Sequence, residues 1–469
     1  MEKAKGETIN MQLIDSQSPY KVNNEVATSG LSTPDAPTSP TVSEESYDPH
    51  KHRNVPNPTS NAETLIHLLK GSLGTGILAM PNAFCNSGLL TGAVATVIIG
   101  TLCTYCLHVL VRAQYKLCKR LRVPILSYPM SMKYALEQGP QCIKWFSPYA
   151  PGLVDGFMIT YQLGICCVYI VFVAKNIKQV TDQYWEPLDI QIHMFILLLP
   201  LILMNYIRNL KLLAPFSTLA NIITFIGLGM IIAYMFEDLP SLSERQMFGT
   251  VRNFALYFGT TLFALEAVGV IIALENNMKT PQYFGGYCGV LNIGMSVIVT
   301  LYILMGFFGY LKYGSDAGGS VTFNLPQDQV MAQSINIMFA IAIFITYALQ
   351  GYVPVEIIWN TYLNQRIQNR KLFWEYDCRY IVTLAITIPR LGLFISLFGA
   401  LCLSALGIAF PAIIEICVLW PDELGPFKLF LIKDLCLILF GLIGLVVGTY
   451  VSIVDIILSF SPGAINQSD

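Results

Sequence analysis

Charged side chains are scarce in this chain of 469 residues, and their scarcity indicates its class. Asp, Glu, Lys and Arg make up 12% of the residues, while 54% are hydrophobic. A typical soluble protein has roughly 25% charged residues. The composition is that of a polytopic membrane protein. The formal net charge of −2 says nothing about partners, because in such chains the distribution of charge matters and its sum does not.

The chain also lacks the motifs of common enzymes. No H-E-x-x-H, G-x-S-x-G or P-loop motif occurs in it. No apolar segment stands near its N-terminus, so we expect no cleavable signal peptide. The 12 cysteines show no disulfide framework. We therefore expect no enzyme, no catalytic residue, no cofactor, no metal site and no nucleic-acid partner.

The apolar residues gather in long stretches that predict transmembrane helices. Eleven such stretches occur, and together they predict an all-α fold. They cover about 62–85, 88–111, 152–174, 191–207, 212–236, 254–275, 287–311, 330–352, 379–394, 395–420 and 433–458.

The basic residues predict the orientation. With the N-terminus inside, the inside segments carry 21 Lys and Arg and the outside segments carry 6, with Lys70 inside a helix. The positive-inside rule therefore favours a cytoplasmic N-terminus. The inside segment 112–151 mixes apolar and basic residues, and we expect it to lie along the cytoplasmic interface.

The two ends of the chain differ from the transmembrane domain, which we place at 61–460. Residues 1–60 are polar and rich in Ser, Thr and Pro, and we expect a disordered cytoplasmic tail. Ser18, Thr33 and Ser39, each followed by Pro, are candidate phosphorylation sites. We expect this tail to regulate or target the protein and to take no part in transport. Residues 461–469 form a short C-terminal tail.

The first apolar stretch contains an interruption. Between His67 and Pro81, the glycines Gly71, Gly74 and Gly76 alternate with Ser72 and Thr75. An unwound backbone survives in a membrane only where protein, ligand or water satisfies it. A half-helix that begins near Thr75 would aim its positive end at the membrane midplane, where it could bind a carboxylate. The alternative is that these glycines only allow close helix packing.

The sixth stretch is interrupted in the same way. It contains Gly259, Thr260 and Thr261, followed by Phe263 and Glu266. Broken first and sixth helices are typical of two inverted five-helix halves. We place the repeats at about 62–236 and 254–420 and an eleventh helix at 433–458. A carboxylate at mid-membrane costs about 2.5–3.5 kcal/mol on insertion scales and marks a functional site. The alternative is that Glu266 only caps the following half-helix.

Several runs together resemble a known family, the proton-coupled amino-acid transporters of the amino acid/auxin permease group. The resemblance covers about residues 60–460, and insect members are the closest relatives expected. The runs are 64–81, 259–266, Leu274-Glu275-Asn276-Asn277-Met278-Lys279, Val353-Pro354-Val355-Glu356-Ile357 and Val447-Gly448-Thr449-Tyr450. The resemblance implies a LeuT-like fold with a 5+5 inverted repeat plus one helix, small neutral amino acids as substrates, and proton symport in many members. Ser72 departs from it, because several members have Asn at that place.

The candidate site follows from the two breaks and the resemblance. We expect the substrate carboxylate at Ser72, Gly74, Thr75 and Gly76, and its ammonium at carbonyls from Thr260 through Thr261 to Phe263. By analogy with LeuT-like folds, Phe263 is an aromatic lid, and Tyr161 on the third helix lines the site. The resemblance implies proton coupling by His67, with Glu266 as its electrostatic partner. Packing is the alternative role for His67.

The predicted function is the transport of small neutral amino acids by proton symport, with protons and membrane lipids as the other partners. Two alternatives stay open. One is a pH-independent uniporter or exchanger, and the other is a sensor with nutrient-signalling partners. The resemblance is compatible with the plasma membrane and with the lysosomal or late endosomal membrane.

Overall fold

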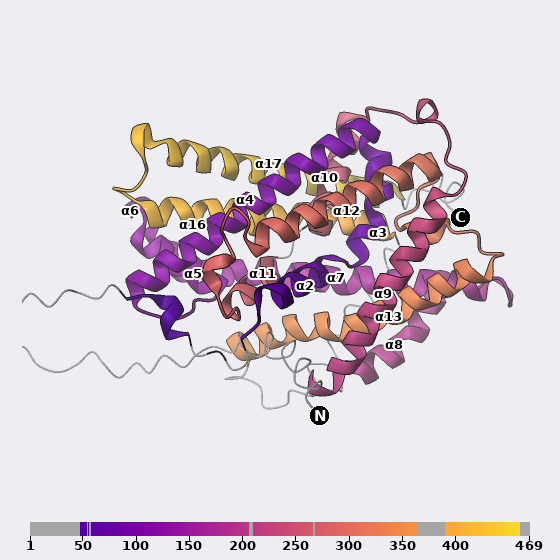
Figure 1. Ribbon diagram of the computed structural model, residues 1–469, viewed down its shortest axis with the longest axis horizontal. Helices are drawn as coiled ribbons and strands as arrows, with labels where there is room; N and C mark the ends of the chain where they lie inside the picture. Colours follow the sequence, from indigo (N-terminus) through magenta and orange to yellow (C-terminus); the bar gives the residue numbers. More distant parts are fainter. Residues whose placement is uncertain are drawn as a thin grey trace, which may run out of the picture.

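The computed structural model describes residues 47–53, 55, 58–205, 210–265, 268–363 and 390–459. Over these ranges the regular secondary structure is helical, and the β contact is one isolated bridge between Thr59 and Met278. Most long helices run roughly along the longest axis of the molecule (Figure 1). This arrangement is that of a polytopic membrane protein.

In chain order, the helices are η2 (Pro49–His52), α2 (Asn61–Ser72), α3 (Thr75–Ser87), α4 (Leu89–Leu121), α5 (Tyr128–Gln138), α6 (Gln141–Lys144), η3 (Ser147–Tyr149), α7 (Ala150–Thr181), α8 (Ile190–Asn205), α9 (Leu210–Phe236), η4 (Leu242–Glu244), α10 (Val251–Leu265), α11 (Val268–Asn276), η5 (Pro281–Tyr283), α12 (Val290–Tyr313), η6 (Gly314–Asp316), η7 (Val321–Asn324), α13 (Val330–Ile357), η8 (Ile358–Leu363), α15 (Leu391–Phe398), η9 (Gly399–Ala409), α16 (Phe410–Leu419), η10 (Pro426–Lys428) and α17 (Leu429–Ser459).

Eight helices of the described part are long and apolar enough to cross a membrane. Two further predicted spans are present in other forms. The first is divided into α2 and α3, and the fourth is the 16-residue helix α8. Most of the ninth, predicted at 379–394, lies outside the described residues. The predicted division between 394 and 395 is wrong, because Leu391–Leu419 form one continuous helix with a π-helical centre at η9.

The segment 112–151 is buried in part. Helix α4 continues to Leu121, and α5 packs against α7 and α16. Tyr128 and Met132 on α5 are buried, and the Tyr128 hydroxyl donates a hydrogen bond to the Leu406 carbonyl at 2.5 Å. Trp145 and Tyr149, further along the segment, are exposed. The expected place of this segment along the cytoplasmic interface stays a prediction.

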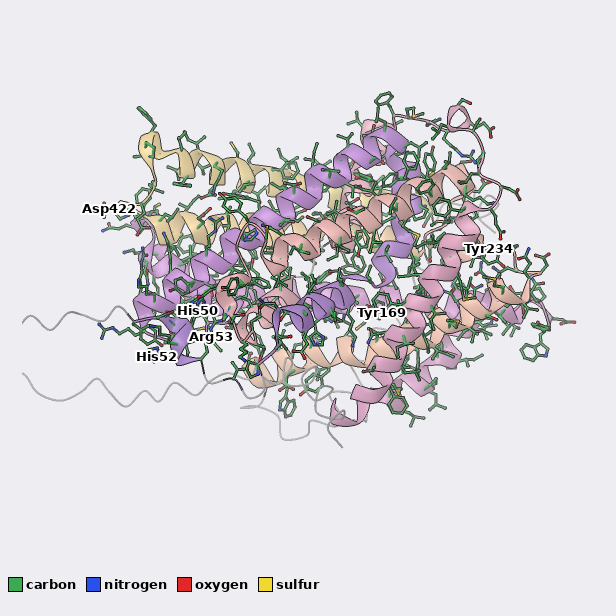
Figure 2. All side chains as sticks on the ribbon, viewed as in Figure 1. His50, His52, Arg53, Tyr169, Tyr234 and Asp422 are labelled. Carbon is green, nitrogen blue, oxygen red and sulfur yellow. The ribbon has the colours of Figure 1, made fainter. Side chains whose placement is uncertain are left out.

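The connecting segments alternate between two ends of the molecule. In Figure 2, His50, His52, Arg53 and Asp422 lie towards one end of the long axis and Tyr234 towards the other, with Tyr169 between them. We call the first of these the inner end, because it carries the segments predicted to face the cytoplasm. The orientation in the membrane stays a prediction.

Candidate functional site

The first predicted span breaks at Leu73 and Gly74. Helix α2 begins with a capping box: the Ser60 hydroxyl accepts a hydrogen bond from Glu63 N–H, and the Glu63 carboxylate accepts one from Ser60 N–H. It ends at Ser72, and α3 begins at Thr75. The half-helix therefore begins where the sequence predicts it.

The N-terminus of α3 offers free donors. Its N-cap is Gly74, which has no side chain to accept a hydrogen bond from the first N–H groups of the helix. Thr75 and Gly76 at this end are buried. Such an end carries a partial positive charge, and its N–H groups can bind an anion.

The predicted break of the sixth span falls at the edge of the described residues. Helix α10 is described as far as Leu265 and α11 from Val268, while Glu266 and Ala267 lie outside the described residues. The break of this span, and the binding of the ammonium at carbonyls from Thr260 to Phe263, therefore stay predictions.

The three α10 side chains predicted for the site are buried within the regular helix. The Thr260 hydroxyl donates to the Leu256 carbonyl of its own helix at 3.0 Å. Thr261 is 0% exposed and Phe263 is 7% exposed. Phe263 is the one of the three nearest in sequence to Glu266 and Ala267, which lie outside the described residues.

The break of the first span lies against α10. An added Cβ at Gly76 would lie 2.6 Å from the Cα of Ala264, so α3 and α10 touch through their backbones. The Tyr302 hydroxyl on α12 donates to the Ala264 carbonyl at 2.8 Å and also contacts the Ser72 carbonyl. The negative end of α2 and the positive end of α3 therefore lie close to Ala264 in a buried place.

Aromatic side chains line the approach to this point. The rings of Tyr161 on α7 and Phe263 on α10 are 6.0 Å apart and steeply inclined to each other, at 71°. Also on α7, the Tyr169 hydroxyl lies 3.7 Å from the position of an added Cβ at Gly74. The predicted residues Tyr161 and Phe263 are thus in contact, and Tyr169 lies against the break.

Sequence reasoning missed two polar residues here. Tyr302 contacts both α2, at the break of the first span, and α10. Gln350 on α13 accepts a hydrogen bond on its backbone carbonyl from Gln162 Nε2 on α7 at 3.0 Å, and the two side-chain amides also contact each other. The signal was a polar side chain near the middle of an apolar span, but Tyr and Gln are too common in such helices to stand out.

His67 lies on α2, before the break. Its Nδ1 atom is buried and has no hydrogen-bond partner within the described part of the chain. The charged side chains of Glu63 and Lys70 lie at helical spacing on either side of His67 and interact electrostatically with its imidazole. The predicted partnership with Glu266 falls on a residue outside the described ones, so it stays a hypothesis.

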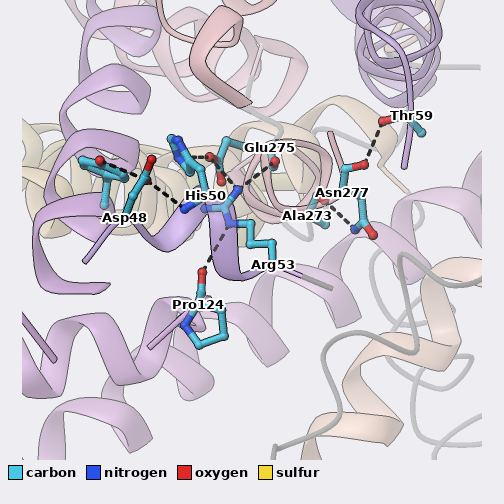
Figure 3. A network of polar contacts seen from close by, with 9 residues as sticks. Asp48, His50, Arg53, Thr59, Pro124, Ala273, Glu275 and Asn277 are labelled. Carbon is cyan, nitrogen blue, oxygen red and sulfur yellow. Dashed lines mark hydrogen bonds and ion pairs between the residues drawn. The ribbon is translucent and has the colours of Figure 1, made fainter. Parts of the chain in front are cut away.

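A polar network closes the inner end (Figure 3). The Arg53 guanidinium donates to the Glu275 carboxylate at 2.9 Å and to the carbonyls of Glu275 and Pro124, both at 3.2 Å. His50 lies 3.6 Å from the same carboxylate. Tyr115 on α4 donates to Asp48 at 3.4 Å. We call this network the inner latch; its members are Asp48, His50, Arg53, Tyr115, Pro124 and Glu275.

The inner latch joins the first span to the sixth, because Arg53 precedes α2 and Glu275 is near the end of α11. A second tie runs beside it, where Thr59 N–H donates to the Asn277 carbonyl and Lys279 N–H donates to the Thr59 carbonyl, both at 2.9 Å. Residues 1–60 were expected to be disordered. The residues of this range that the structure describes do not follow that expectation. Residues 1–46, with the candidate phosphorylation sites, lie outside the described residues.

No group of three or more His, Cys, Asp or Glu side chains among the described residues could hold a metal ion. The substrate site is built from helix ends, hydroxyls, amides and aromatic rings. Such a site suits a small zwitterion, whose two charges match the two kinds of helix end.

The chain belongs to a family of membrane transporters. The family described as "Transmembrane amino acid transporter protein" matches residues 57–454. The protein is thus an amino acid transporter by family and not an enzyme.

Two curated relatives show its place in the family. It is 41% identical over 425 residues to "Proton-coupled amino acid transporter-like protein pathetic" of Drosophila melanogaster, a match that covers 88% of this chain and 89% of that protein. It is 27% identical over 436 residues to "Vacuolar amino acid transporter 4" of Saccharomyces cerevisiae, covering 84% of this chain and 58% of that protein.

Proposed function

We propose that the protein carries small neutral amino acids across a membrane by proton symport with alternating access. The observation that carries this proposal is the buried break between α2 and α3, which brings the N-terminus of α3 against Ala264 of α10. The substrate carboxylate binds the N–H groups of Thr75 and Gly76, and its ammonium binds carbonyls from Thr260 to Phe263. No inorganic cation is needed to neutralise the carboxylate.

The preference for small side chains follows from the walls of the site. Gly76 and Ala264 bring the backbones of α3 and α10 together, and the Tyr169 hydroxyl lies 3.7 Å from the position of an added Cβ at Gly74, so little volume remains beside the break. The rings of Tyr161 and Phe263 cover the approach. A long side chain on the substrate would have to displace these rings. A charged one would enter the site without a partner for its charge.

Proton coupling is assigned to His67, the titratable side chain that precedes the break. A change of its charge alters how α2 interacts with the rest of the fold, which is what a coupled cycle requires. The name of the Drosophila relative supports this proposal. The protein resides in the plasma membrane, the lysosomal membrane or both, and the name of the yeast relative supports an intracellular membrane.

Counterflow tests the proposed function. The purified protein is reconstituted in liposomes loaded with unlabelled amino acid, and entry of the same radiolabelled amino acid is measured. We expect alanine, glycine, serine and proline to exchange, and arginine and glutamate not to exchange. Saturable binding without flux would instead identify a sensor.

A further inference from the structure

Four polar side chains meet near the start of α17, in a cluster that shares no residue with the break of the first span or with the inner latch. Tyr105 belongs to α4, Glu415 to α16, and Lys433 and Asp434 to α17. The Lys433 ammonium donates to the Glu415 carboxylate at 2.5 Å and to the Tyr105 oxygen at 2.6 Å. The same ammonium lies 2.9 Å from Asp434 Oδ1. We call these four residues the α17 cluster, and its two carboxylates share one ammonium.

The charges of the α17 cluster do not balance. With both carboxylates ionised, it has two negative charges and one positive charge. The side chains of Asp434 and Glu415 are 0% and 13% exposed, so water does little to screen the excess. A buried charge without a partner is costly, and such a group takes up a proton instead.

The elements packed against α16 and α17 supply no second positive charge within the described part of the chain. η9 and α15 contain no charged residue. His108 on α4 contacts Asn292 on α12 at 2.6 Å. The other basic residues of α4, α5, α10 and η10 are exposed or have a carboxylate of their own. Arg112, Lys119, Arg120 and Lys428 are exposed, while Lys116, Lys133 and Arg252 pair with Glu423, Glu137 and Asp455.

The two helix ends do not compensate the excess charge either. Asp434 is the sixth residue of α17, beyond the first turn, in which the positive end of a helix acts. Glu415 lies close to the C-terminus of α16, and that end of a helix is negative. The excess negative charge therefore stays with the two carboxylates.

The carboxyl group of Asp434 lacks a hydrogen bond as well as a full counter-charge. Neither of its oxygens has a hydrogen-bond partner among the described residues, although buried polar atoms in native structures nearly always have one. A proton on one of the two carboxyl groups would be a donor to the other, since both lie against the same ammonium. One proton therefore supplies both the missing charge and the missing donor.

We propose that Glu415 and Asp434 hold one proton between them and form a proton-binding site separate from His67. The proton belongs to the pair and not to one carboxyl group. The site exchanges it with the solution at the inner end, because the Lys433 side chain is 29% exposed and the loop from α16 to α17 contains Asp422, which lies at that end (Figure 2). Loss of the proton leaves a net charge between α16 and α17 and weakens their packing. The site goes beyond the proposed function, since it needs no substrate.

Infrared spectra of the purified full-length protein test the site directly, because a protonated carboxyl group has a C=O stretching band that a carboxylate lacks. Asp434→Asn and Glu415→Gln each leave one carboxylate beside one ammonium. At neutral pH we expect each variant to lose the band of one protonated carboxyl group relative to the wild type. Asp455→Asn is the matched control on the same helix, because Asp455 has Arg252 as a partner of its own, and its spectrum should keep the band.

Two further variants separate the site from its neighbours. Lys433→Met leaves two buried carboxyl groups without an ammonium, so we expect it to gain the band of a second protonated carboxyl group. His67→Asn should keep the wild-type band. Loss of the band in His67→Asn would contradict a separate site.

Thermal unfolding gives a second measure. In the native state the pair binds a proton that Asp and Glu of the unfolded chain release, so a rise from about pH 5 to about pH 8 lowers the stability of the wild type. Asp434→Asn lacks this contribution. We therefore expect the unfolding midpoint of the wild type to fall by a few degrees relative to that of Asp434→Asn over this range, and to keep a constant difference from that of Asp455→Asn.

The proposal is wrong if both carboxyl variants keep the wild-type band, or if the midpoints of the wild type and Asp434→Asn stay parallel as the pH changes. Glu415→Gln decides the question where Asp434→Asn fails to fold. The proposal is also wrong if the wild type shows no protonated carboxyl band at neutral pH, a measurement that needs no variant. None of these experiments measures transport, so the proposed function is tested separately.

Discussion

Gly76 is the residue on which the geometry of the site depends most closely. An added methyl group would lie 2.6 Å from the Ala264 backbone, a contact that neither helix can relieve by a side-chain rotation. Overpacking of this kind costs typically about 1–3 kcal/mol, and here it also separates α3 from α10 at the proposed site. We therefore expect transport to require the absence of a side chain at this position.

This requirement gives a direct prediction. Gly76→Ala should lower alanine uptake at least about tenfold while the amount of protein in the membrane stays the same. Gly269→Ala on α11 is the control, because an added Cβ there meets nothing within 4 Å. Equal uptake by the two variants would show that the close approach of α3 and α10 is not needed for transport.

Thr75→Val removes the hydroxyl at the same helix end, and we expect it to abolish binding.

His67 gives the second prediction at this scale. His67→Asn keeps polarity and approximate size but removes the titration. We expect acid-stimulated uptake in the wild type and uptake that is nearly independent of pH between about 5 and 8 in the variant. The measurement is initial uptake at several external pH values. An unchanged pH midpoint in His67→Asn would assign the coupling to another residue.

At the scale of elements, the sequence indicated the break of the first span correctly, while the break of the sixth span stays a prediction because Glu266 and Ala267 lie outside the described residues. Both segments have small residues inside an apolar span. At Gly74 they open the helix, because the residue stands between two helices and caps the second. At Gly259 they serve close packing instead: an added Cβ would lie 2.2 Å from the Ser396 carbonyl oxygen. Composition cannot separate these two uses of glycine, since the difference is which helix lies alongside.

The inner latch was missed for a related reason. Residues 47–60 have the composition of a polar tail, and local sequence gives no sign that Arg53 has a buried acidic partner 222 residues away. Tyr302 was missed because its acceptors are backbone carbonyls, which no side-chain motif marks. The sequence did predict the spans, the half-helix that begins at Thr75 and the family. Each of these depends on long apolar stretches or on local motifs.

The inner latch predicts an effect on stability. The Arg53 and Glu275 side chains are 6% and 8% exposed, and removing one partner of a buried ion pair costs about 3–5 kcal/mol. Arg53→Ala should therefore lower the unfolding midpoint, and the double variant Arg53→Met with Glu275→Met should recover part of the loss. Arg252→Ala is the control: it breaks an ion pair with Asp455 in which the arginine is 57% exposed, worth about 1 kcal/mol or less. A loss no larger than that of the control would contradict a structural role for the inner latch.

The same segment revises the prediction for the N-terminal tail. Deletion of residues 1–55 would remove Asp48, His50 and Arg53, so we expect it to change the substrate affinity. Deletion of residues 1–46 keeps the inner latch and should leave the KM unchanged. The KM of both truncated proteins in reconstituted vesicles checks this. Equal KM values for the two would mean that the segment 47–55 does not influence the substrate site.

At the scale of the whole molecule, burial separates a central set of helices from a peripheral one. In an apolar 18-residue window of each span, 88% of the residues are buried for Val251–Asn276 and 11% for Pro426–Ser459. The sixth span is therefore central, while α17 presents most of its surface outward. We expect the fold to open from the inner end where the inner latch joins the segment before α2 to the end of α11. The inverted repeat and the orientation stay predictions.

The central claim is that amino acid movement is driven by protons through this site. It is tested most directly by loading liposomes that contain the purified protein with buffer near pH 7.5 and placing them in buffer near pH 5.5, on either side of about 6.5, the ordinary pKa of histidine, with labelled alanine outside. We expect alanine to accumulate inside above its external concentration, and a protonophore to abolish the accumulation. Uptake that only equilibrates, at the same rate with and without the pH gradient, would contradict proton symport and identify a uniporter or exchanger.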